Sequence, residues 1–301
     1  MTIESSAIPS SGEQFTSVGE LRLCYETFGE RTGAPLLLIM GLGSQMVVWE
    51  DEFCERLVAR GFWVIRFDNR DVGRSTILRH LPVPTMRQLV LRDPRGASYQ
   101  LEDMADDAAG LLEALEVDGA HVVGASMGGM IAQLVAIRRP DLARSLVSIM
   151  STTGNRRVGL THPRLLRRLF RRRPTDHDGY VRDYIATYRD IGSRAYPPGE
   201  ERMRALAERC YQRGVHPAGS ARQLAAITVA RDRTPLLREL RLPATVIHGD
   251  CDRLVMPSGG RATAAAIPGA RLTVVRGMAH DLPPALWDQA IEEIERTAAQ
   301  A

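Results

Sequence analysis

The segment 124–129, Gly-Ala-Ser-Met-Gly-Gly, has the spacing G-x-S-x-G around Ser126. It lies between a strand-like run, residues 121–123, and a helix-like run, residues 130–137. A serine hydroxyl projects over the end of a sheet only from a sharp strand-to-helix turn, which needs small residues two positions before and two after. The amides that begin the following helix favour negative charge developing beside the serine. The pattern therefore predicts a nucleophile at Ser126.

A serine hydroxyl is a poor nucleophile unless a base accepts its proton, and that base is usually a histidine oriented by a carboxylate. Two downstream loops supply these groups: residues 248–253 read His-Gly-Asp-Cys-Asp-Arg, and residues 277–283 read Gly-Met-Ala-His-Asp-Leu-Pro. Each follows a strand-like run, and parallel strands bring such loops to one edge of a sheet. The order serine, acid, histidine predicts His280 as the base. Composition alone leaves Asp250 and Asp252 as equal candidates for the acid.

Strand-like and helix-like runs alternate along most of the chain, which predicts an α/β fold with a mostly parallel, twisted sheet covered by helices on both faces. Residues 1–18 are polar and serine-rich, and we expect a flexible leader there. Residues 155–235 have several helical patterns and no convincing strand, which predicts a helical cap inserted into the core. The core is then formed by residues 19–154 and 236–301.

With 301 residues, 44% of them hydrophobic and 25% charged, the chain has the composition of a globular protein. Its apolar runs are far shorter than the roughly 20 residues that cross a bilayer, so we expect no membrane span. The first residues do not resemble a signal peptide, and the four cysteines form no CxxC pair, which together favour a reducing cytoplasm. The histidines lack metal-ligand spacing, and no dinucleotide or Walker A motif is present, so we predict neither a metal nor a cofactor.

Residues 155–235 carry 18 arginines and 8 acidic residues, although the net charge of the whole chain is only +3. The most basic part is 164–173, in which Leu165, Leu166, Leu169 and Phe170 repeat at helical spacing. This pattern predicts a cap helix with its apolar face toward the site and its arginines toward water. An alternative is that the basic cap binds an acyl carrier protein. Nucleic acid is disfavoured, because no binding motif accompanies the charge.

Taken together, these motifs resemble the α/β-hydrolase family over nearly the whole chain. The resemblance implies that the segment 124–129 is the family's nucleophile elbow, that Asp252 is the acid of the triad, and that His280 is its histidine. Residues 40–43, Met-Gly-Leu-Gly, match the family's first motif but lack its usual histidine. That motif supplies a backbone N–H to an oxyanion hole, so the resemblance assigns the amides of Leu42 and Met127 to that role.

A narrower resemblance covers residues 36–76, which include a Met-Gly first motif, a tryptophan about eight residues later and the phrase RFDNRDVGRS. This stretch is similar to the aclacinomycin methylesterase-like subgroup. It implies an ester hydrolase connected with secondary metabolism, and it makes Gly41, Trp49 and Arg70 candidate pocket residues. Arg70 has a second interpretation as a residue that stabilises the loop beneath the site, and Trp49 has a second interpretation as a residue that packs in the core.

The function predicted first is hydrolysis of a small-molecule carboxylic ester through an acyl-enzyme, with a methyl ester or lactone of a secondary metabolite as substrate. A second hypothesis keeps the same residues but transfers the acyl group or cleaves another bond, as a lactonase, a thioesterase or an acyltransferase or cyclase that releases a polyketide. A third is a non-catalytic small-molecule binder on the same scaffold.

Overall fold

The computed structural model describes residues 10–169, 171 and 173–301. Its centre is an eight-stranded sheet in the order β1-β2-β4-β3-β5-β6-β7-β8. The first two strands pair antiparallel, β2 also pairs antiparallel with β4, and every other pairing is parallel, which confirms the predicted α/β fold. The strands are β1 Gln14–Val18, β2 Leu21–Phe28, β3 Ala34–Ile39, β4 Phe62–Phe67, β5 Ala120–Ala125, β6 Ala143–Ile149, β7 Ala244–Gly249 and β8 Arg271–Val275.

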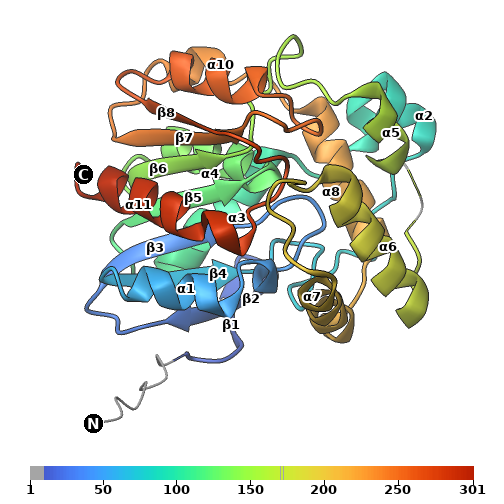
Figure 1. Cartoon of the computed structure of the whole chain (residues 1–301), viewed down its shortest axis with the longest axis horizontal. Helices are drawn as coiled ribbons and strands as arrows, with labels where there is room; N and C mark the ends of the chain where they lie inside the picture. The colour runs from blue at the N-terminus through green and yellow to red at the C-terminus, as the bar shows by residue number, and fades with distance from the viewer. Residues whose placement is uncertain (1–9, 170, 172) are drawn as a thin grey trace.

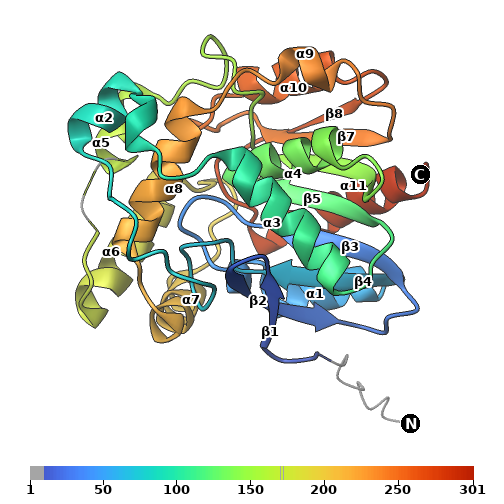
Figure 2. The same cartoon turned by 180° about the vertical axis from the view of Figure 1, so that it is seen from behind.

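Helices cover both faces of the sheet (Figures 1 and 2). One face carries α1 (Asp51–Val58) and α11 (Trp287–Ala298), and the other carries α3 (Leu101–Ala114), α4 (Met127–Arg138) and α10 (Ser258–Ala266). The short elements are η1 Met46–Val48, α2 Met86–Leu91, η2 Pro94–Gly96, α9 Thr234–Leu237 and η3 Pro284–Leu286.

The side chains of strand β3 pack into two hydrophobic clusters, one on each face of the sheet. Successive side chains of a strand point to opposite faces of the sheet. Leu36 and Leu38 therefore pack into the cluster that contains the buried residues of α1 and α11, whereas Leu37 and Ile39 pack into the cluster of α3 and α4. All four side chains are fully buried, because parallel central strands are covered on both sides.

The N-terminal segment differs from its prediction. Residues 14–18 form edge strand β1, which pairs with β2, and Ser10 forms an isolated bridge to Phe28. The side chains of β1 are mostly exposed, so the strand is held by backbone pairing and not by burial. For that reason its polar sequence resembled a leader. Residues 1–9, the rest of the predicted leader, lie outside the described residues.

Within the described part of residues 155–235 the chain forms helices and no strand: α5 Pro163–Leu169, α6 His177–Ile191, α7 Glu200–Arg213, α8 Pro217–Val229 and the start of α9. Figure 1 shows α5, α6, α7 and α8 together on one side of the sheet. No helix in the ranges that the structure describes is long and apolar enough to span a bilayer.

Candidate active site

Ser126 forms the junction between β5 and α4, with φ 57° and ψ −119°. A residue with a side chain adopts such a backbone only where its surroundings enforce it. A Cβ atom on Gly124 would lie 2.1 Å from the carbonyl oxygen of Gly128, and one on Gly128 would lie 2.0 Å from that of Ile39. The two glycines of the G-x-S-x-G spacing are therefore required by backbone packing, and the turn presents Ser126 at the carboxyl end of β5.

The fold brings Ser126, Asp252 and His280 together from three separate strand ends. His280 follows β8, and its Nε2 lies 2.9 Å from Oγ of Ser126. Asp252 follows β7, and its Oδ2 lies 2.7 Å from Nδ1 of His280. Because a carboxylate only accepts hydrogen bonds, Nδ1 carries the proton and the lone pair of Nε2 faces the serine hydroxyl. This arrangement allows the imidazole to accept the hydroxyl proton.

The two aspartates that composition could not separate have different partners. The backbone amides of Leu254 and Val255 donate to Oδ1 of Asp252 at 2.8 and 2.9 Å, which leaves Oδ2 for His280. Oδ1 of Asp250 instead accepts a hydrogen bond from the amide of Gly277 at 2.7 Å. Asp250 thus ties the two loops together, and Asp252 is the carboxylate that orients the histidine.

A second histidine helps to keep Asp252 ionised. Nε2 of His248 lies 2.8 Å from the carbonyl of Val255 and 3.4 Å from Oδ2 of Asp252. Since a carbonyl only accepts, Nε2 carries the proton and points its dipole toward this region. Burial alone would raise the pKa of Asp252, but His280 and His248, through charge and hydrogen bonds, hold that pKa well below its usual range. The carboxylate is therefore charged at neutral pH.

The loop after β3 lies directly against the serine. A Cβ atom on Gly41 would lie 3.1 Å from Cβ of Ser126. The loop is held from both sides, because Nδ2 of Asn69 donates to the carbonyl before Gly41 at 3.0 Å and the amide of Gly43 donates to Oε1 of Gln223 at 2.8 Å. These two supports were not among the predicted site residues. Asn69 lies in the stretch that resembled a family loop, whereas Gln223 in α8 carried no motif at all.

The two backbone amides predicted to form an oxyanion hole are adjacent in sequence to Ser126 and Gly41. Met127 follows Ser126 and is the first residue of α4, where an amide has no acceptor within its own helix. Leu42 follows Gly41 and lines the cavity described below. Their convergence on one substrate oxygen stays a prediction.

A cavity of about 220 Å³ opens against Ser126 and His280. Gly41 and Trp49, two of the three predicted pocket residues, line it. Within the described ranges of the chain, no group of three or more His, Cys, Asp or Glu side chains is arranged to hold a metal ion.

Arg70, the third predicted pocket residue, is not among the described residues that line the cavity, and that prediction is corrected here. Its guanidinium donates to both carboxylate oxygens of Asp107 in α3, with Nη2 2.6 Å from Oδ1, and lies over the ring of Tyr99. Pairing with a buried carboxylate draws the side chain away from the site, so Arg70 fastens its loop to α3.

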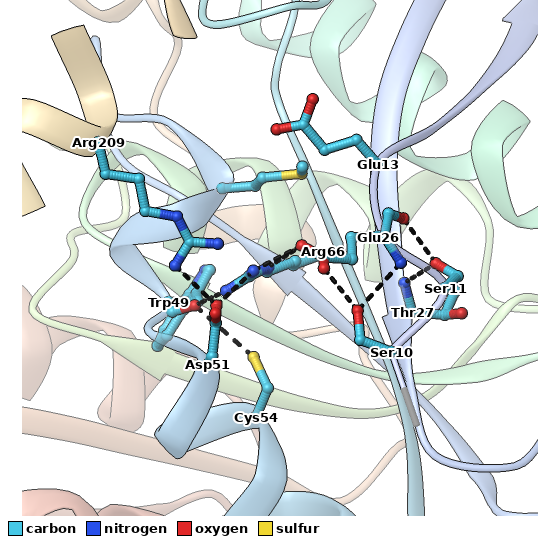
Figure 3. Close-up of polar contacts among 12 residues, drawn as sticks. Ser10, Ser11, Glu13, Glu26, Thr27, Trp49, Asp51, Cys54, Arg66 and Arg209 are labelled. Atoms are coloured by element: carbon cyan, nitrogen blue, oxygen red, sulfur yellow. Dashed lines mark hydrogen bonds and ion pairs between the residues drawn. The ribbon is translucent and has the colours of Figure 1, made fainter. Parts of the chain in front are cut away.

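Trp49 forms a rigid wall of the cavity. It is only 3% exposed, and its ring stacks on Phe53 with the centroids 5.4 Å apart. Figure 3 shows the buried guanidinium of Arg66, which donates to the carbonyl of Trp49 and also contacts Glu26 at 2.5 Å and Asp51 at 2.6 Å. Because the Arg66 guanidinium hydrogen-bonds the backbone carbonyl of Trp49, it holds this wall of the cavity in place.

A second wall of the cavity comes from α6 and is aromatic. Tyr180, Tyr184 and Tyr188 are four residues apart, so they lie on one face of the helix, and all three line the cavity. Their ring centroids are separated by 6.1 Å and 5.2 Å along the row. The cavity is thus lined by a row of aromatic rings along α6 in addition to Trp49.

The predicted cap helix is less apolar toward the site than its sequence indicated. Arg168, Arg171 and Arg173 line the cavity, whereas Leu166 is 41% exposed. Phe170, which the sequence placed on the apolar face, lies outside the described residues. Carboxylates of α6 pair with the first two arginines, but only Arg168 is shielded by this pairing, at 17% exposed against 57% for Arg171. The expectation that the arginines face water is therefore wrong for Arg168, whereas Arg171 and Arg173 are exposed.

The family model described as alpha/beta hydrolase fold matches residues 34–283, a range that contains Ser126, Asp252 and His280. The chain belongs to the α/β-hydrolase family. This assignment confirms the predicted fold and the predicted class of enzyme, a hydrolase.

Similar proteins agree with the assignment. The chain is 29% identical to rhodomycin D methylesterase of Streptomyces peucetius over an alignment that covers 89% of this chain and 92% of that protein. The enol-lactonase of Burkholderia xenovorans has the same fold, with a TM-score of 0.75 and 23% identity over 95% of this chain and 100% of that one. A hydrolase of Pseudomonas aeruginosa superposes with a TM-score of 0.71 and 25% identity over 97% and 99%.

Proposed function

We propose that the protein hydrolyses a carboxylic ester through an acyl-enzyme, with Ser126 as nucleophile, His280 as general base and then acid, and Asp252 as the group that orients the histidine. The observation that carries the proposal is the unbroken set of contacts from Asp252 through His280 to the Ser126 hydroxyl, at 2.7 and 2.9 Å, beside a cavity. A binder would not need this alignment of a charged carboxylate, a tautomerically fixed imidazole and a hydroxyl.

In the first half of the reaction Oγ of Ser126 bonds to the ester carbonyl carbon while its proton passes to Nε2 of His280. The amides of Leu42 and Met127 stabilise the negative charge on the carbonyl oxygen. The bond from carbon to the alcohol oxygen then breaks, and His280 returns the proton to that oxygen. Water repeats the sequence on the acyl-enzyme and releases the acid, so no co-reactant other than water is required.

We assign the substrate as an ester of a planar aromatic compound. The similarity to rhodomycin D methylesterase favours a methyl ester. The aromatic residues of the cavity support this choice. The chain has only three tryptophans, and two of them, Trp49 and Trp287, line the cavity with the tyrosine row of α6. Flat ring systems gain both apolar burial and offset or edge-to-face contacts from such walls.

The test is labelling with a fluorophosphonate, which bonds covalently to an activated serine, followed by measurement of the intact mass. We expect one adduct on the wild type, none on Ser126→Ala and much slower labelling of His280→Ala. Ser44→Ala is the matched control, because Ser44 lines the same cavity but has no histidine partner among the described contacts. A panel of methyl esters, lactones and thioesters then identifies the bond, with the fastest turnover expected for aromatic methyl esters.

Absence of an adduct on folded wild-type protein would contradict the proposal. An adduct that persists in Ser126→Ala would assign the nucleophile elsewhere. Faster turnover of thioesters than of esters would favour the second hypothesis, in which the same three residues release an acyl chain from a carrier.

A further inference from the structure

Three of the four arginines that line the cavity are paired with carboxylates. Nε of Arg202 lies 2.8 Å from Oε2 of Glu50, and Nη1 of Arg171 lies 3.2 Å from Oδ1 of Asp183. Arg168 is also engaged, by Asp190 at 3.0 Å and by the hydroxyl of Thr187 at 2.8 Å. The charges of these three guanidiniums are therefore compensated before any ligand enters the cavity.

Arg173 is different. It lines the cavity, and within the described part of the chain it forms neither an ion pair nor a side-chain hydrogen bond. Its Nη1 atom would lie 3.5 Å from a Cβ atom on Gly43. Gly43 is two residues after Gly41, which packs on Ser126. The uncompensated guanidinium is therefore on the side of the cavity formed by the loop that flanks the nucleophile.

The tyrosine row approaches the same place. The charge of Arg173 opposes the effect of burial, which is the main cause that raises the pKa of the Tyr180 phenol. The guanidinium thus lies near the first ring of the aromatic wall as well as beside Gly43. A ligand stacked along that wall would reach the guanidinium with one end and the serine with another part.

We propose that Arg173 binds an anionic group, a carboxylate in the first instance, on the aromatic substrate at a position remote from the scissile ester. The inference rests on the proposed function, because it describes the substrate of that same site. A guanidinium presents two parallel N–H donors that match both oxygens of a carboxylate. Each of the other cavity arginines is already paired with a protein carboxylate, so we assign the binding of an anion to Arg173.

The test compares two planar probes of nearly equal shape, anthraquinone-2-carboxylate and anthraquinone-2-carboxamide. Their dissociation constants are measured on the full chain by quenching of tryptophan fluorescence, since Trp49 and Trp287 line the cavity. We expect the wild type to prefer the carboxylate and Arg173→Gln to lose roughly tenfold of that preference, with part of it kept in Arg173→Lys. Arg164→Gln removes the same charge from a position of α5 that does not line the cavity and should keep the preference.

Equal affinity of the wild type for the two probes would overturn the proposal, as would a preference that Arg173→Gln and Arg164→Gln retain alike. Failure of both probes to bind would also count against it. These outcomes are separate from failure of the proposed function, because the probes contain no ester. A protein that prefers the carboxylate through Arg173 but takes no fluorophosphonate at Ser126 would keep the anion site and lose the esterase assignment.

Discussion

Arg222 of α8 and Asp71 of the loop after β4 form a buried ion pair with two contacts, Nε to Oδ2 at 2.8 Å and Nη2 to Oδ1 at 2.6 Å. Their side chains are 1% and 0% exposed. A similar contact joins Arg213 of α7 to Asp68 of the same loop at 2.6 Å. Two helices of the segment 155–235 are thus anchored to one core loop, and this anchoring fixes α8, from which Gln223 supports the loop beside Ser126.

Replacing Arg222 with methionine should lower the free energy of unfolding by about 3–5 kcal/mol, because Asp71 would remain buried without its counter-charge. Urea denaturation at neutral pH measures the loss. Arg209→Met is the matched control on the neighbouring helix, since Arg209 is 40% exposed and pairs with Asp51 at the surface. That change should cost about 1 kcal/mol or less. Equal losses in the two variants would contradict the special role of the buried pair.

The contribution of Asp71 should also depend on pH. Burial alone would raise the pKa of Asp71, but hydrogen bonds from Arg222, from the amide of Leu78 and from the hydroxyl of Tyr99 lower that pKa below its usual value. An acid whose folded pKa is depressed stabilises the fold above its unfolded pKa of about 3.9, and this stabilisation is lost as pH falls through the folded pKa.

The difference in unfolding free energy between the wild type and Asp71→Asn should therefore be constant around neutral pH and shrink below about pH 4. Urea titrations across this range measure it. A difference that grows as the solution becomes more acidic would show that the folded pKa of Asp71 is raised and not lowered.

The sequence predicted the site well where chemistry and backbone geometry impose the same residues. Gly124 and Gly128 are required by contacts of about 2 Å that any Cβ would make, so the motif around Ser126 could be recognised without a structure. The loops of Asp252 and His280 were found because each follows an apolar strand in a parallel sheet.

The walls of the cavity were less predictable, because they depend on pairings between distant segments. The arginines of 164–173 have the spacing of a solvated helix face, and only the acidic group that α6 supplies explains why Arg168 is shielded from water. From the sequence, Arg70 could face either a substrate or a carboxylate of the protein. Its position is determined by the pairing with Asp107, which is 37 residues away in the sequence. Local patterns carry no information about such long-range partners.

The two neighbouring aspartates should respond differently to the same substitution. Asp252→Asn keeps the shape of the side chain but removes the charge that fixes the tautomer of His280, so kcat/KM for an ester should fall by about 10⁴-fold. Asp250→Asn replaces a group that accepts from the Gly277 amide, and its remaining carbonyl oxygen can still accept that bond. The loss in kcat/KM should there be roughly tenfold or less. A larger loss for Asp250→Asn than for Asp252→Asn would reverse the assignment of the acid.

Gly41→Ala tests how closely the first loop controls the serine. The added Cβ atom would lie 3.1 Å from Cβ and 3.6 Å from Oγ of Ser126, so either the loop or the serine must shift by a few tenths of an ångström. Because small misplacements of reacting groups are costly in rate, kcat should fall by roughly ten- to a hundredfold while KM changes little. Gly110→Ala in α3 is the control for a clash away from the serine, since its Cβ would lie 2.4 Å from Cγ1 of Val18 and should lower stability without changing kcat. The measurements are the rate of ester hydrolysis and the thermal unfolding of both variants. A Gly41→Ala protein with unchanged kcat would show that the loop shifts without displacing Ser126.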